Sequence, residues 1–197
     1  MPSANAAGTI AQMWAHTPSI RIYAGAVIQT SLDQASRVNM RKWLALAAAI
    51  VVVDQITKYV IVQKFMLHET LFITPFFNMV RVHNTGAAFS MLADAGGWQR
   101  LFFIGVAVAA SIWVVWLLRH HSQQKLFCLA LAMILGGAVG NLIDRVLFGY
   151  VVDFVQVHYA GWFFPAFNVA DSAITCGAAL MIWDGLRPQR NALVDKT

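Results

Sequence analysis

Charged side chains are scarce in this 197-residue sequence, in which Asp, Glu, Lys and Arg together make up 12% of the residues. A soluble globular domain averages about 25%, and the 59% share of hydrophobic residues and the mean hydropathy of +0.61 deviate in the same direction. The composition therefore indicates a membrane protein. The net charge of +5 is spread along the chain rather than gathered in a basic patch, so a nucleic-acid partner is not expected.

Cysteine and several common catalytic signatures are also nearly absent. The 2 cysteines, Cys128 and Cys176, lie within apolar runs and form no CxxC pair, which argues against a disulfide framework or a zinc knuckle. The 6 histidines include no HExxH motif and no pair four residues apart, so a zinc site is not expected. His83 and Ser90 are present without a GxSxG elbow or an SxxK signature, and there is no Walker-type glycine loop.

Four apolar segments are long enough to cross a bilayer. The first provides about 28 Å of helix at about 1.5 Å per residue, close to the thickness of the hydrocarbon core. The sequence therefore predicts an all-α membrane protein with four transmembrane helices and with both termini on one side. The four segments are Leu44–Val62, Trp98–Leu118, Leu126–Leu147 and Phe167–Trp183.

Basic residues set the expected orientation, because Lys and Arg accumulate in cytoplasmic loops. More of them flank the termini and the short loop between the second and third spans than the opposite ends, although Lys58 and Lys64 blur the difference. Both termini are therefore expected in the cytoplasm, with segments 63–97 and 148–166 outside. The residues counted inside are Arg37, Arg41, Lys42, Arg119, Lys125, Arg187, Arg190 and Lys196; those counted outside are Lys58, Lys64, Arg81, Arg100 and Arg145.

The two outward segments do not have the composition of ordinary polar loops. Residues 70–82 and 151–159 are rich in β-branched and aromatic side chains, which is typical of short strands. Trp162, Phe163 and Phe164 are aromatic residues of the kind that gather at a membrane interface. A small β-rich element on the outward-facing surface of the membrane is therefore expected.

The chain divides into one membrane domain and two tails. Residues 1–40 are mixed in composition, and their best apolar run, Ile22–Ile28, is too short to span a bilayer. They are expected to be a cytoplasmic tail or the result of a mis-assigned start, with translation beginning at Met40. Residues 41–190 form the predicted transmembrane domain, and residues 191–197 form a short C-terminal tail.

Asp153 lies in a nearly all-apolar run, YVVDFV, with no local cationic partner. A desolvated aspartate should have a raised pKa, and a second carboxylate nearby would raise one of the two further. Asp171 comes 18 positions later and could meet it if residues 159–166 turn the chain back. A pair of this kind could provide the general base and general acid of an aspartic protease.

Asp171 also has a structural interpretation. Asn168 and Asp171 occupy the N-cap and N3 positions of a predicted helix, which is a variant of the capping box. An acidic residue in the first turn offsets the helix dipole. The two interpretations are compatible, because a capped helix start would also fix the direction of the carboxylate.

Other polar residues within the spans allow both structural and functional interpretations. Asp144 and Arg145 are expected to form a local charge-balanced pair, although Arg145 could also hold a backbone carbonyl or the acid of another segment. Asp54 precedes Lys58 by four residues, the favourable order for an intrahelical pair, and Lys58 could extend outward to the interface. Asn141 follows a small-xxx-small pattern formed by Gly136 and Gly140, which lets helices approach closely. The turn at residues 83–90 is rich in small residues and could approach a ligand closely.

Five short motifs occur along the chain in a characteristic order. They are Asp54–Lys58 (DQITK), Asn84–Ser90 (NTGAAFS), Gly136–Arg145 (GGAVGNLIDR), Gly149–Phe154 (GYVVDF) and Pro165–Ser172 (PAFNVADS). In this order the chain resembles the lipoprotein signal peptidases (signal peptidase II), the aspartic proteases of the bacterial inner membrane. The resemblance covers residues 40–187, and no matched motif position departs from it.

The resemblance implies a membrane aspartic endopeptidase that removes the signal peptide of prolipoproteins, just before a diacylglyceryl-modified lipobox cysteine. It assigns catalysis to Asp153 and Asp171, with the active site near the periplasmic face. It also implies a protein that needs no metal or organic cofactor, contacts membrane lipid and is inhibited by globomycin; a monomer is expected. The substrate-binding or supporting residues would be Asp54, Lys58, Asn84, Gly86, Asn141, Asp144, Arg145 and Asn168.

Two other classes of protein remain as alternatives. A proton-coupled carrier could use Asp54, Asp144 and Asp171 as relay carboxylates. However, the acidic residues gather toward one face, and none of the four spans is visibly broken at mid-membrane. A purely structural membrane scaffold offers no reason for the unpaired Asp153.

Overall fold

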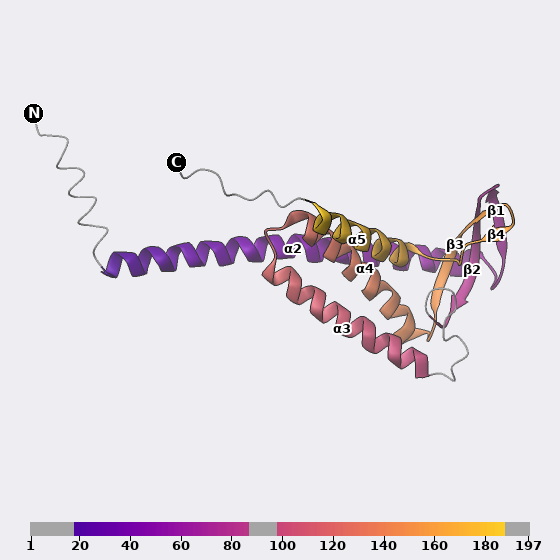
Figure 1. Ribbon diagram of the computed structural model, residues 1–197. Helices are drawn as coiled ribbons and strands as arrows, with labels where there is room; N and C mark the ends of the chain where they lie inside the picture. The colour runs from indigo at the N-terminus through magenta and orange to yellow at the C-terminus, as the bar shows by residue number, and fades with distance from the viewer. Residues whose placement is uncertain (1–17, 87–97, 188–197) are drawn as a thin grey trace, which may run out of the picture.

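The computed structural model describes residues 18–86 and 98–187, with side chains described from residue 40 onward. Its helices are α2 (Pro18–Lys64), α3 (Trp98–His120), α4 (Lys125–Leu147) and α5 (Val169–Leu186), as shown in Figure 1. Each has a segment long and apolar enough to cross a membrane, and in α2 this segment is Met40–Lys64. The four predicted spans are confirmed, with ends that differ by a few residues.

Helix α2 is longer than the predicted span, because it begins at Pro18. Proline is favoured at the first position of a helix, and the next proline in the chain is Pro75. Nothing in the sequence between them therefore forces the helix to break. Residues 18–39, part of the predicted tail, are a helical continuation of the first span, whereas residues 1–17 lie outside the described part of the chain.

A four-stranded antiparallel sheet lies at the end of the bundle where α2 ends and α5 begins (Figure 1). Strand β3 coincides with the predicted segment 151–159, whereas the predicted segment 70–82 is split into a hairpin by a turn at Pro75 and Phe76. The strand order is β1-β2-β3-β4. The strands are β1 (Thr70–Thr74), β2 (Phe77–Asn84), β3 (Val151–Tyr159) and β4 (Trp162–Phe163).

The expected chain reversal between residues 159 and 166 is present. Ala160 and Gly161 have φ values of 47° and 84° and join β3 to β4. Two successive residues with positive φ are typical of a two-residue hairpin turn, because that geometry matches the twist of the flanking strands. The turn sends the chain back from the sheet to the start of α5.

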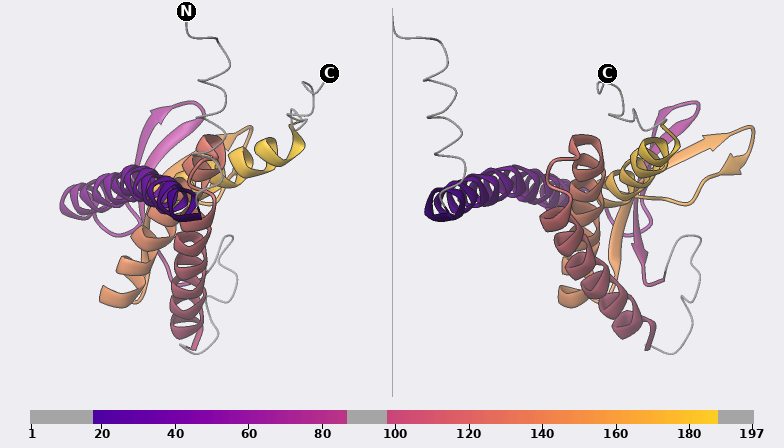
Figure 2. Two further views of the ribbon diagram at one scale, coloured as in Figure 1. Left: turned by 90° about the vertical axis from the view of Figure 1, so that its left-hand side faces the viewer. Right: turned by 60° about the vertical axis from the view of Figure 1, so that its left-hand side comes forward.

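Helix α4 packs against each of the other three helices, whereas α2 and α3 meet over a much smaller area (Figures 1 and 2). Glycines make this close packing possible. A Cβ atom at Gly136 would lie 2.8 Å from Cβ of Ile50 on α2, and one at Gly137 would overlap the Ala170 carbonyl oxygen on α5. The predicted small-xxx-small contact of α4 is therefore confirmed, and Gly137 extends it to a second helix.

A buried cluster of charged residues joins α2 to α4. The Nζ atom of Lys58 lies 2.8 Å from Oδ2 of Asp54 and 2.9 Å from Oδ2 of Asp144. The side chain of Lys58 is only 4% exposed, so the expectation that it extends outward to the interface was wrong. Lys58 instead lies on the face of α2 that is packed against α4, where two carboxylates replace its hydration shell.

The predicted pair of Asp144 with Arg145 was also wrong, because Asp144 is paired with Lys58. Adjacent residues on a helix point in different directions and do not face each other. Arg145 instead donates from Nη1 to the carbonyl oxygen of Asn141 and from Nη2 to that of Gly86, at 3.4 and 3.1 Å. The alternative expectation, that Arg145 holds backbone carbonyls, is therefore confirmed.

Two arginines at the sheet end bind the exposed carbonyls at helix C-termini. Arg81 on β2 donates from Nη1 to the carbonyl oxygens of Val62 and Phe65, at 3.2 and 2.9 Å. Arg100 on α3 donates to the carbonyl oxygens of Arg145 and Val146, at 2.9 and 2.8 Å. The last carbonyls of a helix lack partners within the helix and attract cations. These contacts fasten the sheet to α2 and the start of α3 to the end of α4.

Replacing Gly137 by alanine should destabilise the bundle by about 1–3 kcal/mol, because the added methyl group overpacks a backbone contact. The matched control is Gly105→Ala on α3, where a Cβ atom would meet nothing within 4 Å. Thermal unfolding of the purified proteins in detergent measures the difference. Equal midpoints for the two variants would contradict the packing described for Gly137.

Replacing Lys58 by methionine should cost about 3–5 kcal/mol, because it leaves two buried carboxylates without their cation. Lys64→Met is the control, since Lys64 is an exposed residue on the same helix. The comparison is made by thermal or denaturant unfolding in detergent. A Lys58→Met variant as stable as Lys64→Met would show that the cluster does not hold α2 to α4.

Candidate active site

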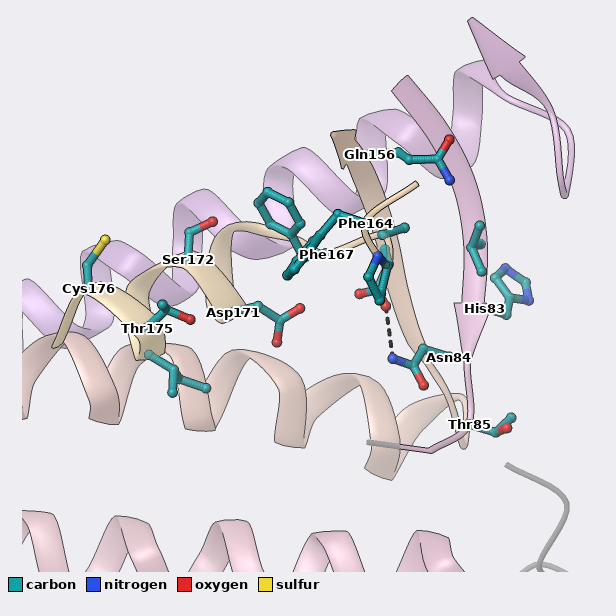
Figure 3. A pocket seen from close by; sticks show the side chains of 15 residues that line it. His83, Asn84, Thr85, Gln156, Phe164, Phe167, Asp171, Ser172, Thr175 and Cys176 are labelled. Carbon is teal, nitrogen blue, oxygen red and sulfur yellow. Dashed lines mark hydrogen bonds between the residues drawn. The ribbon is translucent and has the colours of Figure 1, made fainter. Parts of the chain in front are cut away.

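Asp153 and Asp171 both line a cavity of about 760 Å³ between the sheet and α5. Asp153 lies in β3 and Asp171 in the first turn of α5. Figure 3 shows the side chains of Asp171 and Asn84 facing the same space. The two aspartates singled out in the sequence therefore share one site, although they come from different kinds of secondary structure.

Asp153 is buried and is held by two amides. Asn84 donates from Nδ2 to its Oδ2 at 3.0 Å, shown as the dashed line in Figure 3, and Asn168 donates from Nδ2 to its Oδ1 at 2.7 Å. Burial, followed by the negative charge of Asp171, raises the pKa of Asp153 to about 7, against the opposing effect of the two amides and the Lys58 charge. Asp153 can therefore exchange a proton near neutral pH.

Asp171 is fixed by the predicted capping box. The Oδ1 atom of Asn168 accepts a hydrogen bond from the backbone N–H of Asp171 at 2.9 Å, and Oδ2 of Asp171 accepts one from the backbone N–H of Asn168 at 3.3 Å. Asn141 donates from Nδ2 to the other carboxylate oxygen, Oδ1, at 2.8 Å. The helix start thus orients the Asp171 carboxylate, as its structural interpretation allowed.

Asn168 connects the two aspartates. Its Oδ1 atom accepts from the backbone of Asp171, so its Nδ2 atom must face the opposite way, toward Asp153. The same amide group donates to Oδ1 of Asn141 at 3.3 Å and to the carbonyl oxygen of Val152 at 3.3 Å. Because Asn168 is fully buried, it fixes the relative positions of the two carboxyl groups with little freedom.

Lys58 lies behind this pair and orients Asn141. The Lys58 ammonium donates to Oδ1 of Asn141 at 3.0 Å. An ammonium group has donors and no acceptor, so Oδ1 must face Lys58 and Nδ2 must face Asp171. Asp54 and Asp144 support the site from the same cluster, because Asp54 accepts from the backbone N–H of Ala170 at 2.9 Å and Asp144 accepts from that of Val152 at 3.2 Å.

Asn84 lines the other side of the site and is supported by Gly86. The backbone N–H of Gly86 donates to Oδ1 of Asn84 at 3.0 Å, which leaves Nδ2 of Asn84 to face Asp153. The Gly86 carbonyl is bound by Arg145, whose guanidinium lies 5.1 Å from the centre of the Phe103 ring. Residues 87–90 of the predicted turn, including Ser90, lie outside the described residues.

Of the residues predicted for the site, Asn84, Asp153 and Asp171 line the cavity. Lys58 and Asn168 belong to the hydrogen-bonded layer behind it. Within residues 40–86 and 98–187, no three His, Cys, Asp or Glu side chains are grouped so that they could hold a metal ion. The other residues of the supporting layer are Asp54, Gly86, Asn141, Asp144 and Arg145.

Several residues that line the cavity were not named as site residues, although His83 and Thr85 belong to the turn that was expected to approach a ligand. His83 stacks on Tyr150 with ring centres 3.8 Å apart, and burial, followed by the charges of Arg81 and His68, lowers its pKa. The apolar lining could not be inferred from the sequence, because the turn between β3 and β4 is what brings it to the site. For His83, its position next to Asn84 was the sequence feature that could have indicated a place in the site. The additional lining residues are Val82, His83, Thr85, Gln156, Phe164, Pro165, Ala166, Phe167, Ser172, Ile174, Thr175 and Cys176.

The arrangement places two carboxyl groups, one of which titrates near neutral pH, at a cavity with largely apolar walls. Each of the four carboxylate oxygens accepts a hydrogen bond from an N–H group of Asn84, Asn141 or Asn168. Two carboxyl groups held in this way can divide the roles of general base and general acid.

Comparison with known proteins places this site in a family context. Residues 46–187 match the family model described as Signal peptidase (SPase) II. The lipoprotein signal peptidase of Janthinobacterium sp. (strain Marseille) is 55% identical over 149 residues, covering 76% of this chain and 90% of that protein. The lipoprotein signal peptidase of Ralstonia nicotianae is 56% identical over 148 residues, covering 75% and 86%.

Solved structures agree with this relationship. A structure described as a bacterial membrane enzyme, determined by the in meso method, has a TM-score of 0.70 and 32% sequence identity, and the match covers 79% of this chain and 94% of that one. A second, with the same description, has a TM-score of 0.66 at 32% identity and covers 75% and 94%. The chain therefore belongs to the signal peptidase II family, the lipoprotein signal peptidases.

Proposed function

We propose that this protein is an aspartic endopeptidase that removes the signal peptide from diacylglyceryl-modified prolipoproteins, cutting just before the lipidated lipobox cysteine. The observation that carries the proposal is the meeting of Asp153 and Asp171 at one cavity, with every carboxylate oxygen oriented by an N–H donor. Membership of the signal peptidase II family supports the choice of substrate.

The proposed reaction uses the two carboxyl groups as a pair that holds one proton. The ionised carboxyl takes a proton from a water molecule as the water oxygen attacks the scissile carbonyl carbon, while the protonated carboxyl donates to the carbonyl oxygen. When the C–N bond breaks, the carboxyl that took the water proton delivers it to the leaving nitrogen. The other carboxylate takes a proton from a hydroxyl of the tetrahedral intermediate as the C=O bond re-forms, so the pair again holds a single proton. The pKa of Asp153, at about 7, supports the presence of that proton near neutral pH.

The shape of the cavity supports a substrate that is part peptide and part lipid. Its walls along α5 and the β4 region are largely apolar and include Phe164, Phe167 and Ile174, whereas its polar groups gather around the two aspartates. Sites of about 300–1,000 Å³ with apolar walls and a few oriented polar groups are typical of small-ligand binding. The apolar walls would hold the acyl groups or the signal peptide, and the polar groups would hold the scissile peptide.

We also propose that the sheet and the active site face the periplasm, with both termini in the cytoplasm. Within the described residues, Lys58, Arg81, Arg100 and Arg145 are bound by carboxylates or backbone carbonyls. These four therefore have structural reasons to lie at the sheet end, despite the tendency of basic residues to remain inside. At the opposite end no ion pair is found for the basic residues of the described part, which are Arg41, Lys42, Arg119, Lys125 and Arg187.

The ion pairs also weaken the alternative of a proton-coupled carrier. Asp54 and Asp144 are both bound to Lys58 in a buried cluster, and each also accepts a hydrogen bond from a backbone N–H group. Carboxylates neutralised in this way are poor relay groups, because protonation would break the contacts that join the helices.

Replacing either Asp153 or Asp171 by asparagine should reduce cleavage of a lipidated precursor by more than about 100-fold, because each substitution removes one partner of the acid–base pair. The control is Asp184→Asn, an acidic position on the opposite end of α5. Cleavage is followed by gel mobility with purified proteins of matched thermal stability. Wild-type rates in either of the first two variants would disprove the assignment of the pair.

The rate should depend on pH through the proton shared by the pair. Because the pKa of Asp153 is about 7, the proton is present below this value and is lost above it, so kcat/KM should fall as the pH rises beyond about 7. Replacing Asn84 by alanine removes a hydrogen bond that lowers this pKa, so the alkaline fall should move to higher pH. A profile with an unchanged alkaline limb in Asn84→Ala would contradict this role, whatever the change in overall rate.

A further inference from the structure

A second hollow extends toward the other end of the bundle and shares no lining residue with the aspartate cavity. It is a groove of about 590 Å³ between α2 and α3, with α4 as its floor. The groove exists because α2 and α3 both pack on α4 but make few contacts with each other (Figures 1 and 2). Its lining residues are Leu44, Ala47, Ala48, Val51, Ser111, Ile112, Val115, Trp116, Arg119, Leu135, Gly136 and Val139.

The dimensions of the groove match one leaflet of a bilayer. Along α3 it runs from Arg119 to Ser111, which corresponds to about 12 Å at about 1.5 Å per residue. Half of the hydrocarbon core of a bilayer is about 15 Å. Because α3 ends at His120, Arg119 lies at the membrane boundary and Ser111 lies toward the bilayer centre. The groove therefore begins at the boundary and ends near the midplane.

The walls of the groove are apolar and open to the side. Ile112 and Trp116 on α3 are 67% and 50% exposed, and Ala48 on the facing side of α2 is also exposed. Small side chains on α2, Ala47 and Ala48, leave the width of the groove unfilled. In a membrane such a surface is covered by hydrocarbon, and the elongated shape suits a single acyl chain.

The mouth of the groove is positively charged. Arg119 lines it, is exposed and has no ion pair within the described part of the chain. Arg41 is exposed one helical turn before Leu44, a lining residue, and so lies on the same side of α2. Lys42 and Lys125 line a separate, smaller hollow of about 340 Å³ together with Trp43. Arg119 and Arg41 are therefore positioned to attract a negative charge at the membrane boundary.

We propose that this groove binds one anionic phospholipid of the leaflet opposite the active site, with an acyl chain between α2 and α3 and its phosphate on Arg119. A guanidinium group binds phosphate through two parallel hydrogen bonds, and basic residues near a membrane surface attract anionic lipid. The bound chain would fill the space that α2 and α3 leave between them and would hold α3 to the bundle. The charge at the mouth favours this occupant over a helix of a second copy, which would bring its own Arg119.

The test uses the full-length purified protein, stripped of lipid and then mixed with phosphatidylglycerol or with phosphatidylcholine of the same acyl chains. Native mass spectrometry counts the bound lipids, and thermal unfolding measures their effect. One phosphatidylglycerol should be retained per chain and should raise the unfolding midpoint more than phosphatidylcholine does. Equal retention and equal stabilisation by the two lipids would overturn the proposal and show only non-specific surrounding lipid.

Two pairs of variants locate the site. Arg119→Gln should weaken phosphatidylglycerol binding by at least tenfold. Arg187→Gln, which changes an exposed arginine directly after the end of α5, should not. Ala48→Phe should block the groove and abolish the effect of phosphatidylglycerol, whereas Ala49→Phe, at an exposed position outside the groove, should not. Unchanged binding in Arg119→Gln would overturn the proposal, even if Ala48→Phe failed to fold. The proposal would also be overturned if the protein formed a dimer that Ala48→Phe disrupts, because the groove would then be occupied by a second copy of the chain.

Discussion

The position of one ammonium group determines much of this structure. Lys58 is buried and in contact with Asp54 on its own helix, with Asp144 on α4 and with Asn141 beside the active site. A buried cation is costly unless its charge is balanced and its three donors are used, and here both conditions are met. The same contacts set the spacing of α2 and α4 and orient the amide that holds Asp171, so stability and site geometry depend on the same group.

The two aspartates of the site are held by different kinds of secondary structure, a strand and the start of a helix. In β3, Asp153 pairs with Val82 on the neighbouring strand β2. Asn84, two residues beyond Val82 on that strand, donates the hydrogen bond that supports the Asp153 carboxylate. At the start of α5, Asp171 is fixed by its own backbone through the capping box. The positive φ values of Ala160 and Gly161 allow the chain to return over the short distance between these elements. Neither aspartate depends on a long flexible side chain for its position, which suits the proposed acid–base pair.

Much of the fold could be predicted from local patterns. The four spans follow from apolar length, β3 from its β-branched residues, and the start of α5 from the spacing of Asn168 and Asp171. Errors arose where the partner of a charge is distant in the sequence. The adjacency of Asp144 and Arg145 suggested a pair, but neighbouring helical residues diverge, and the true partner of Asp144 comes from α2. The hairpin within residues 70–82 was not predicted for a simpler reason. The composition is strand-like on both sides of Pro75 and Phe76, so the segment was not divided at the turn that these two residues form.

The pairing of Asp54 with Lys58 within one helix turn has a consequence for biosynthesis. The two charges lie in the first of the four described spans, so they can neutralise each other as soon as α2 is helical, before the three later spans have been made. The later spans then find partners already in place: α4 brings Asp144 to the waiting Lys58, and α5 brings the N–H of Ala170 to the waiting Asp54. Insertion into the membrane can thus proceed in chain order without exposing an uncompensated charge of α2 to lipid.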